Sequence, residues 1–271
     1  MDLIRRILIT GANGTLGHAT ARYFLERDVN CQVFLGVRER RELAEIVVKD
    51  FPGRAFLCPL EITSAEAWTN ALAGIEAQSG PLNVLINNAA MGDSGSLAEV
   101  DMQRVRQLFE VNLFATLELT QVALRQMIER ESGTVLFISS IAGRVPMPFL
   151  MPYSMSKFAL SAAAAGLRAE MDQLKKNVHI AVIEPGAIHT GFNQAMTNRK
   201  YAWMGSSSYF AHQAEKMQKQ ERATFKFLEA RSTRGIVKQI VKASEAARPK
   251  LRYVSPWIQG FGVRMARIFG V

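Results

Sequence analysis

The sequence predicts an α/β protein built on one doubly wound, parallel β-sheet. Short, continuous apolar segments alternate with longer amphipathic segments along the 271 residues. Strands that are buried on both faces have this apolar character, and helical crossovers join such strands in parallel order. The series occurs once, without an internal duplication or a low-complexity linker. We therefore expect a single domain with a C-terminal extension.

Each expected strand is marked by an apolar run. The six clearest runs cover residues 7–9, 33–35, 55–57, 84–86, 135–138 and 180–183, and a weaker patch at 251–254 predicts a seventh strand. Helical patterns lie between them, at roughly 15–27, 39–49, 64–77, 102–130 and 153–174. We expect the main domain to span 1–254, with an irregular, substrate-covering segment at 187–230 and a tail at 255–271.

The composition is that of a packed globular chain. Hydrophobic residues make up 48% and charged residues 21%, which argues against a disordered chain, a collagen-like repeat or a disulfide-stapled miniprotein. The net charge of +9 is unevenly distributed, because residues 199–271 hold 15 Lys and Arg against 4 Asp and Glu. The basic character therefore concerns the last quarter of the chain only.

The cysteines and apolar runs favour a reducing, cytoplasmic environment. Cys31 and Cys58 lie in or beside apolar runs and form no framework for disulfides or zinc, so we expect buried thiols and no metal. The N-terminal apolar run is too short for a signal peptide, and no run of ~18 apolar residues predicts a membrane span.

A glycine-rich turn, TGANGTLG at residues 10–17, directly follows the first expected strand and opens the first expected helix. Glycines let the backbone approach a pyrophosphate, and a helix N-terminus supplies N–H donors to it. The motif alone is common, but this context favours a nucleotide-binding turn over a plain tight turn.

The end of the second expected strand bears on the choice of dinucleotide. An acid roughly 20 residues beyond the last glycine would bind a ribose 2′-hydroxyl. Here Val37 stands at that position and Arg38 follows it. A guanidinium binds a 2′-phosphate, which a carboxylate would repel. We therefore favour NADP(H) over NAD(H); in the alternative, the arginines are a solvated helix turn and Glu39 binds the ribose.

A tyrosine and a lysine are spaced for joint action in YSMSK, at 153–157. Tyr153 and Lys157 lie one turn apart on one face of the expected helix. A neighbouring ammonium stabilises a phenolate, so we expect Lys157 to lower the pKa of Tyr153. Ser140 ends an apolar strand 13 residues before the tyrosine, and its hydroxyl is suited to bind a substrate carbonyl. Tyr-x-x-x-Lys alone also occurs by chance on surface helices.

Taken together, these motifs resemble those of the short-chain dehydrogenase/reductase family. The resemblance covers roughly residues 5–190. It consists of TGANGTLG, Asn87-Asn88-Ala89-Ala90, Asn112, Ser140, Tyr153-x-x-x-Lys157 and Pro185-Gly186 with Thr190. It implies a Rossmann-type, NAD(P)-dependent oxidoreductase that interconverts a carbonyl and an alcohol, commonly as a dimer or tetramer.

The resemblance also implies roles for individual residues. Tyr153 would be the general acid or base, Ser140 would orient the carbonyl, Lys157 would hold the ribose, and Asn112 would hold a water in a proton relay. Glu61 stands where the family usually has an adenine-contacting Asp. The expected cofactor site is formed by Gly11, Asn13, Gly14, Thr15, Leu16, Gly17, Arg38, Glu61, Asn88, Ala89, Tyr153, Lys157, Pro185, Gly186 and Thr190.

One departure from the family keeps other functions open. Shorter family members usually carry TGxxxGxG, whereas here Thr15 takes the glycine slot and the turn reads TGxxGxxG. That spacing is more common in extended members, which are often epimerases or dehydratases. A nucleotide-binding regulator without catalysis is a further alternative, although the complete Ser-Tyr-Lys set argues against it.

The covering segment and the tail carry the remaining expectations. Met and aromatic residues predict a pocket for a bulky, lipophilic carbonyl or alcohol; they are Phe192, Met196, Tyr201, Trp203, Met204, Tyr209 and Phe210. The tail has apolar positions 257, 261, 265 and 268 at helical spacing beside Arg264 and Arg267. We expect this stripe to pack on another subunit, or else to contact a membrane; nucleic-acid binding is not expected.

Overall fold

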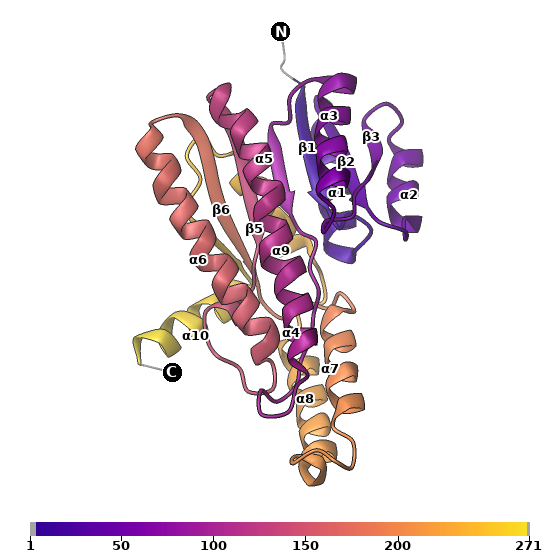
Figure 1. The fold of residues 1–271 in the computed structure, drawn as a ribbon, viewed down its shortest axis with the longest axis vertical. Helices are drawn as coiled ribbons and strands as arrows, with labels where there is room; N and C mark the ends of the chain where they lie inside the picture. Colours follow the sequence, from indigo (N-terminus) through magenta and orange to yellow (C-terminus); the bar gives the residue numbers. More distant parts are fainter. Residues whose placement is uncertain (1–3, 270–271) are drawn as a thin grey trace.

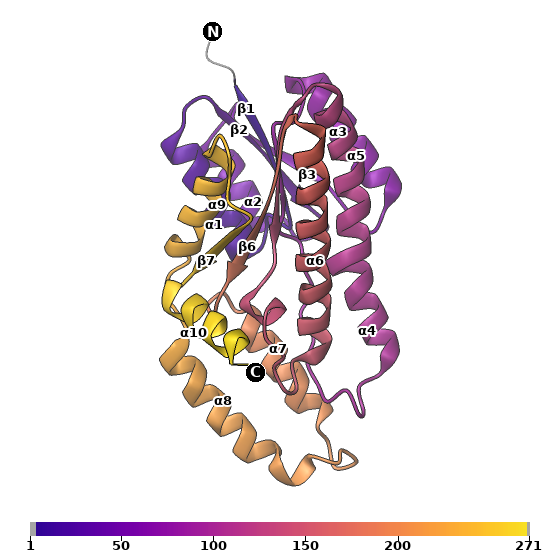
Figure 2. The ribbon, with the colours of Figure 1, turned by 90° about the vertical axis from the view of Figure 1, so that its left-hand side faces the viewer.

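The computed structural model describes residues 4–269, apart from the side chains of residues 202, 203 and 227, so that of Trp203 lies outside the described part. Its centre is a seven-stranded sheet in which all neighbours are parallel, in the order β3-β2-β1-β4-β5-β6-β7. The strands are β1 (Arg5–Thr10), β2 (Cys31–Val37), β3 (Ala55–Pro59), β4 (Val84–Asn87), β5 (Ser132–Ile138), β6 (Asn177–Pro185) and β7 (Arg252–Ser255). The predicted fold class is confirmed (Figure 1), and the weak apolar patch is the seventh strand, β7, beside β6 in Figure 2.

Helices cover both faces of this sheet (Figures 1 and 2). Helices α1 (Thr15–Arg27), α2 (Glu42–Asp50) and α9 (Arg234–Glu245) pack on one face, and α3 (Ala65–Ser79), α5 (Thr116–Glu129) and α6 (Met151–Leu174) pack on the other. Successive strand residues enter opposite cores, as Ile7 and Ile9 do on one side and Leu8 on the other. This arrangement explains why the strands are apolar without alternation.

Two of the expected helices differ from their predicted form. The pattern at 102–130 is divided into α4 (Met102–Phe109), a π-helical turn (Glu110–Ala115) and α5. Helix α2 begins at Glu42, three residues later than expected. The side chain of Asn13, in the glycine turn, accepts hydrogen bonds from the backbone N–H groups of Leu43 and Ala44 and so fixes that start. Such a cap depends on a distant residue and leaves no local signal.

The segment at 187–230 is more regular than its sequence suggested. It forms α7 (Phe192–Trp203), a short 3-10 turn (Ala211–Gln213) and α8 (Ala214–Leu228). This pair extends beyond the carboxyl end of the sheet (Figure 2). Helix α9 was also absent from the expected helices, although its residues Ile236, Val237, Ile240 and Val241 are buried against the sheet.

The tail forms helix α10 (Trp257–Ile268), which packs against β7. Its buried residue is Val263, whereas Trp257, Phe261 and Ile268 of the predicted apolar stripe are exposed. The stripe therefore faces away from the domain. Within residues 4–269, no helix combines the length and apolar character needed to cross a membrane.

Candidate active site

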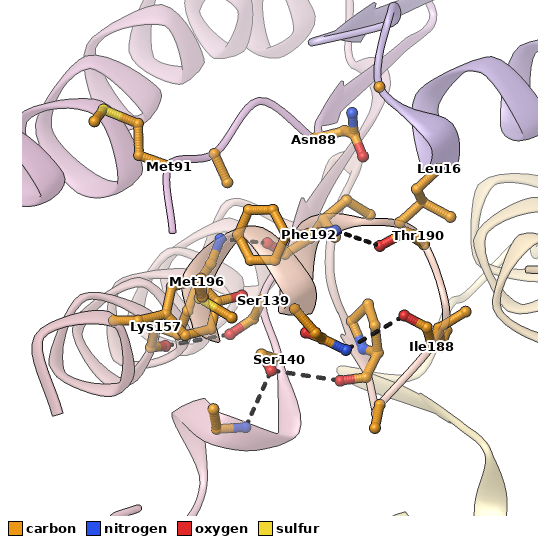
Figure 3. Close-up of a pocket in the computed structure, with 18 of the residues that line it drawn as sticks. Leu16, Asn88, Met91, Ser139, Ser140, Lys157, Ile188, Thr190, Phe192 and Met196 are labelled. Atoms are coloured by element: carbon orange, nitrogen blue, oxygen red, sulfur yellow. Dashed lines mark hydrogen bonds between the residues drawn. The ribbon is translucent and has the colours of Figure 1, made fainter. Parts of the chain in front are cut away.

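One cavity of about 1310 Å³ lies at the carboxyl ends of the strands. Its walls come from the loops after strands β1 to β6 and from α6, α7, α8 and α10. Figure 3 shows part of this lining, including Ser140, Lys157 and Phe192. Every predicted site residue except Asn112 lines it. Parallel sheets bind ligands at this edge, where the loops on the two sides of the sheet diverge.

The glycine turn is shaped by close backbone contacts. Gly11 has a φ of +63°, and a Cβ there would lie 2.9 Å from Ala89 Cα. A Cβ on Gly17 would lie 2.8 Å from both Ala12 Cα and the Gly11 carbonyl oxygen. Larger residues at these two positions would collide with backbone, so the glycines place the N-terminus of α1 directly against the cavity. Gly14 caps that helix and Leu16 extends into the cavity.

The side chain of Asn88 is committed to the fold of the same turn. Its amide nitrogen donates to the carbonyl oxygens of Thr10 (2.8 Å) and Gly11 (3.1 Å). Asn13 is committed in the same way, because its side chain caps α2 and also donates to Glu42. Both residues line the cavity, but their side chains chiefly shape the turn that a dinucleotide would contact.

Thr15, the departure from the usual glycine pattern, joins the turn to the covering segment. Its hydroxyl donates a hydrogen bond of 3.1 Å to the backbone oxygen of Thr190. Thr190 lies just before α7, and Phe192 N–H donates weakly to its hydroxyl (3.4 Å). The threonine thus ties the two halves of the cavity rim together, which a glycine would not do.

The end of the cavity beside β2 carries positive charge. Arg38 and Arg40 line it together with Glu61, whose carboxylate lies 3.4 Å from Arg38 Nη1. Burial alone would raise the pKa of Glu61, but hydrogen bonds from Thr63 and the Arg38 guanidinium lower it overall. The side chain of Arg38 is 69% exposed, so it has the freedom to turn toward a ligand.

The predicted serine, tyrosine and lysine converge on the middle of the cavity. Ser140 follows β5, accepts the N–H of Ala142 at 3.1 Å and lies 3.5 Å from the Pro185 carbonyl oxygen. Tyr153 stands in the first turn of α6. Lys157 lies one turn later, with its Nζ 5.7 Å from the centre of the tyrosine ring and donating to the Ile138 carbonyl at 2.9 Å. The strand end and the helix thereby fix all three side chains.

Burial dominates the acid–base properties of this cluster. It raises the pKa of Tyr153 to about 12, although the Ser140 hydroxyl acts in the opposite direction. Burial also lowers the pKa of Lys157 to about 7, and within the described residues no carboxylate pairs with the buried ammonium. We expected Lys157 to lower the pKa of Tyr153, but the pKa of Tyr153 is raised. The positive charge of Lys157 is itself disfavoured by burial.

Asn112 lies behind the cavity, within the π-helical turn. Its side chain accepts the N–H of Met91 at 2.7 Å and donates to the Met91 carbonyl at 2.9 Å and to Ser156 Oγ at 3.0 Å. It thus fastens the loop after β4 to helix α6. The wide turn brings these groups together, in keeping with the occurrence of π-turns near functional sites.

Several cavity residues were not predicted. Ile258, Gln259, Gly262 and Val263 of α10 line it, and Gln259 accepts the N–H of Ala187 and donates to the Leu228 carbonyl, both at 2.8 Å. The far wall adds Lys200 of α7 and Glu221 of α8, which pair at 2.6 Å. No local motif marks these residues, because their place depends on how α7, α8 and α10 pack.

Comparison with known proteins shows the family. The family model described as short chain dehydrogenase matches residues 5–201. Dehydrogenase/reductase SDR family member 7B of Danio rerio is 31% identical over 195 residues, which are 69% of this chain and 62% of that protein. The ketoacyl reductase HetN of a Nostoc species is 31% identical over 186 residues, covering 68% of this chain and 63% of that protein. The chain matches less than two thirds of the length of either relative.

Solved structures share the whole fold. A short-chain dehydrogenase/reductase from Burkholderia phymatum in complex with NAD has a TM-score of 0.81 at 17% identity, covering 99% of this chain and 95% of that one. An actinorhodin polyketide ketoreductase with NADPH has a TM-score of 0.76 at 20% identity, covering 93% and 95%. The chain belongs to the short-chain dehydrogenase/reductase family of oxidoreductases, whose members bind nicotinamide cofactors.

Proposed function

We propose that this protein is an NADP(H)-dependent oxidoreductase that reduces the carbonyl of a bulky, lipophilic substrate or oxidises the corresponding alcohol. The observation that carries the proposal is the convergence of Ser140, Tyr153 and Lys157 in the cavity that the glycine turn also lines. The name of the Nostoc relative, a ketoacyl reductase, supports carbonyl chemistry.

The proposed chemistry divides between a cofactor and the chain. The reduced nicotinamide supplies a hydride to the carbonyl carbon when bound. Tyr153 donates its hydroxyl proton to the carbonyl oxygen, so that one hydride and one proton yield the alcohol. Ser140 donates a hydrogen bond to the same oxygen, and Lys157 holds a ribose hydroxyl. Because burial lowers the pKa of Lys157 to about 7, the lysine can favour the phenolate that remains on Tyr153 only while it keeps its proton.

The cations beside β2 support a preference for NADP(H). Arg38 and Arg40 line the cavity, whereas Glu39 between them is not among the described lining residues. A 2′-phosphate at this end would meet two guanidinium groups, and a charge-assisted hydrogen bond contributes about 1.5–3 kcal/mol. An adenosine without the phosphate would gain less from them.

The apolar walls support a lipophilic substrate. Tyr153, Ala142 and Met196 form a buried apolar cluster, and Met147, Leu150 and Phe192 pack on it. The rings of Tyr153 and Phe192 lie 5.6 Å apart. A substrate carbonyl at the tyrosine would therefore be flanked by methionine and aromatic groups, which adapt to large apolar shapes.

A cofactor and substrate screen tests the proposed function. Purified protein is mixed with NADPH or NADH and a series of carbonyls, from short ketones to acyl and steroid ketones, while the absorbance of the reduced nicotinamide is followed. We expect NADPH consumption with the larger apolar carbonyls. A preference for NADH, activity on small polar carbonyls alone, or epimerisation without net NADPH consumption would contradict the proposal.

The proposal extends to location and partners. The exposed apolar face of α10 supports packing on a second copy of the chain, since Trp257, Phe261 and Ile268 are each more than half exposed. The buried free thiols Cys31 and Cys58 are in keeping with a reducing cytoplasm. Contact of the same face with an anionic membrane is the alternative. Sedimentation and vesicle binding distinguish it from packing on a second copy.

A further inference from the structure

The cavity has an outer wall that the reaction chemistry does not use. Two helix faces form it. Helix α7 contributes Phe192, Asn193, Met196, Thr197 and Lys200, and α8 contributes Glu221, Thr224, Phe225 and Leu228. The spacing on each helix is that of a single face, and both faces line the same cavity. Phe192, Met196, Phe225 and Leu228 make apolar parts of the wall, which is charged at the end formed by Lys200 and Glu221.

The charged end is a compact cluster of three side chains. Lys200 is 6% exposed, and its Nζ lies 2.6 Å from Glu221 Oε2. The Tyr201 hydroxyl donates to the same Oε2 at 2.7 Å, and Lys200 Nζ lies 4.9 Å from the centre of the Tyr201 ring. A buried ammonium is costly unless it is paired, and these contacts hold it at the cavity wall.

The cluster leaves hydrogen-bonding capacity facing the cavity. An ammonium has three N–H donors, and within the described residues the protein partner of Lys200 is Glu221. Both recorded bonds to Glu221 go to Oε2, so among the described residues Oε1 has no protein donor. The pair carries no net charge. A neutral hydroxyl could accept from Lys200 and donate to Glu221, whereas a carboxylate could accept from Lys200 but has no proton to donate to Glu221.

The position of the cluster gives a length. Lys200 follows Phe192 by eight residues, which is about 12 Å along a helix. The Phe192 ring is in contact with Tyr153, where the carbonyl would react. Phe192 and Met196 occupy the distance between the two polar ends. A molecule that fits this wall would have its reacting carbonyl at one end, an apolar body, and a second polar group roughly 12 Å from the carbonyl.

We infer that Lys200 and Glu221 form a specificity subsite for a neutral, hydrogen-bonding group, such as a hydroxyl, at the distal end of an elongated apolar carbonyl substrate. The inference rests on the proposed function for the identity of the reacting group. It adds a chemical class to that function, because an apolar wall alone would favour plain hydrocarbon chains. Lys200 and Glu221 act here in binding and take no part in the proton transfer.

The test uses a matched pair of ligands: a straight-chain methyl ketone, and its terminal-hydroxyl counterpart with the hydroxyl roughly 12 Å from the carbonyl. Calorimetry measures binding of each to the full chain saturated with NADP⁺, which has no hydride to transfer, so that the ketone binds without being reduced. We expect the hydroxyl ketone to bind about tenfold more tightly, as one hydrogen bond to a charged group would give. Lys200→Met and Glu221→Gln should each remove most of that preference.

Controls separate this inference from the proposed function. Lys219→Met, at an exposed position of α8, should keep the full preference. Equal binding of the two ketones, including no binding of either, would overturn the subsite, as would a preference that persists in both Lys200→Met and Glu221→Gln. A terminal carboxylate that binds more tightly than the hydroxyl would overturn the assignment to a neutral group. Failure of turnover with intact discrimination in binding would instead contradict the proposed function.

Discussion

At the scale of single residues, burial gives the site its chemical character. Tyr153 is 7% exposed and Lys157 is 2% exposed, although both carry groups that usually face water. Lys157 is held by one backbone carbonyl instead of a carboxylate. A lysine buried in this way is poised to change its charge near neutral pH, where a surface lysine stays charged.

The buried lysine should be visible in the stability of the protein. Burial lowers the pKa of Lys157 to about 7, whereas a lysine in an unfolded chain titrates near ~10.4. Between these values the unfolded chain binds more protons, so the free energy of unfolding gains from this residue as the pH rises. Urea unfolding at pH ~7 and ~9 should show a gain in the parent that is about 2 kcal/mol larger than in Lys157→Met. Equal pH dependence in both proteins would contradict the burial argument.

A second residue-scale prediction concerns Arg38. If its guanidinium binds a 2′-phosphate, Arg38→Ala should raise the KM for NADPH about tenfold or more and leave that for NADH nearly unchanged. Arg125→Ala, at an exposed position of α5, is the matched control for loss of a positive charge. Steady-state kinetics with both cofactors makes the comparison. Equal effects of Arg38→Ala on the two cofactors would count against the phosphate contact.

At the scale of elements, the sequence was informative wherever a local pattern sufficed. The strand runs, α1 and the glycine turn follow from apolar continuity and spacing, and all lie where expected. The features that the sequence did not predict depend on how distant elements pack together. The polar, Met-rich segment folds into α7 and α8, which form a wall of the cavity, and the sequence did not predict α9. Gln259 reaches the site because α10 lies beside the Pro185–Gly186 loop.

The glycine turn offers an element-scale prediction with an internal control. Gly17→Ala should lower the free energy of unfolding by about 1–3 kcal/mol, because its Cβ would collide with backbone atoms that cannot move away. Gly74→Ala, within α3, meets nothing within 4 Å and should raise it by about 0.5–1 kcal/mol. Thermal or urea unfolding gives both values. A free energy of unfolding that Gly17→Ala leaves unchanged or raises would show that the backbone contacts at Gly17 do not exclude a Cβ.

At the scale of the whole molecule, the basic, aromatic C-terminal quarter is part of the active site as well as the surface. One side of α10 contributes Gln259 and Val263 to the cavity, and the other exposes Trp257 and Phe261. Among the described lining residues, the basic side chain that this quarter contributes to the cavity is Lys200, so most of its positive charge lies elsewhere. Association through the exposed face of α10 would couple oligomer formation to the shape of the cavity.

The oligomeric state of the protein tests whether the exposed face of α10 packs on a second copy. Sedimentation of the full chain should show a dimer or larger oligomer, and a Trp257→Ser, Phe261→Ser double variant should shift it toward the monomer. Leu43→Ser, at an exposed position of α2, serves as the control. A monomeric parent that binds vesicles only when they contain anionic lipid would replace the second copy with a membrane as the partner of this face.

In the proposed reaction, Tyr153 transfers the proton to the substrate carbonyl within this cavity. This step is tested most directly by Tyr153→Phe, which keeps the ring and its packing on Phe192 and removes only the hydroxyl. NADPH binding is measured by fluorescence, and turnover by loss of reduced nicotinamide with the best ketone from the screen. We expect NADPH binding within about twofold of the parent and a loss of turnover of about 10²-fold or more. Turnover at the parent rate would contradict the account.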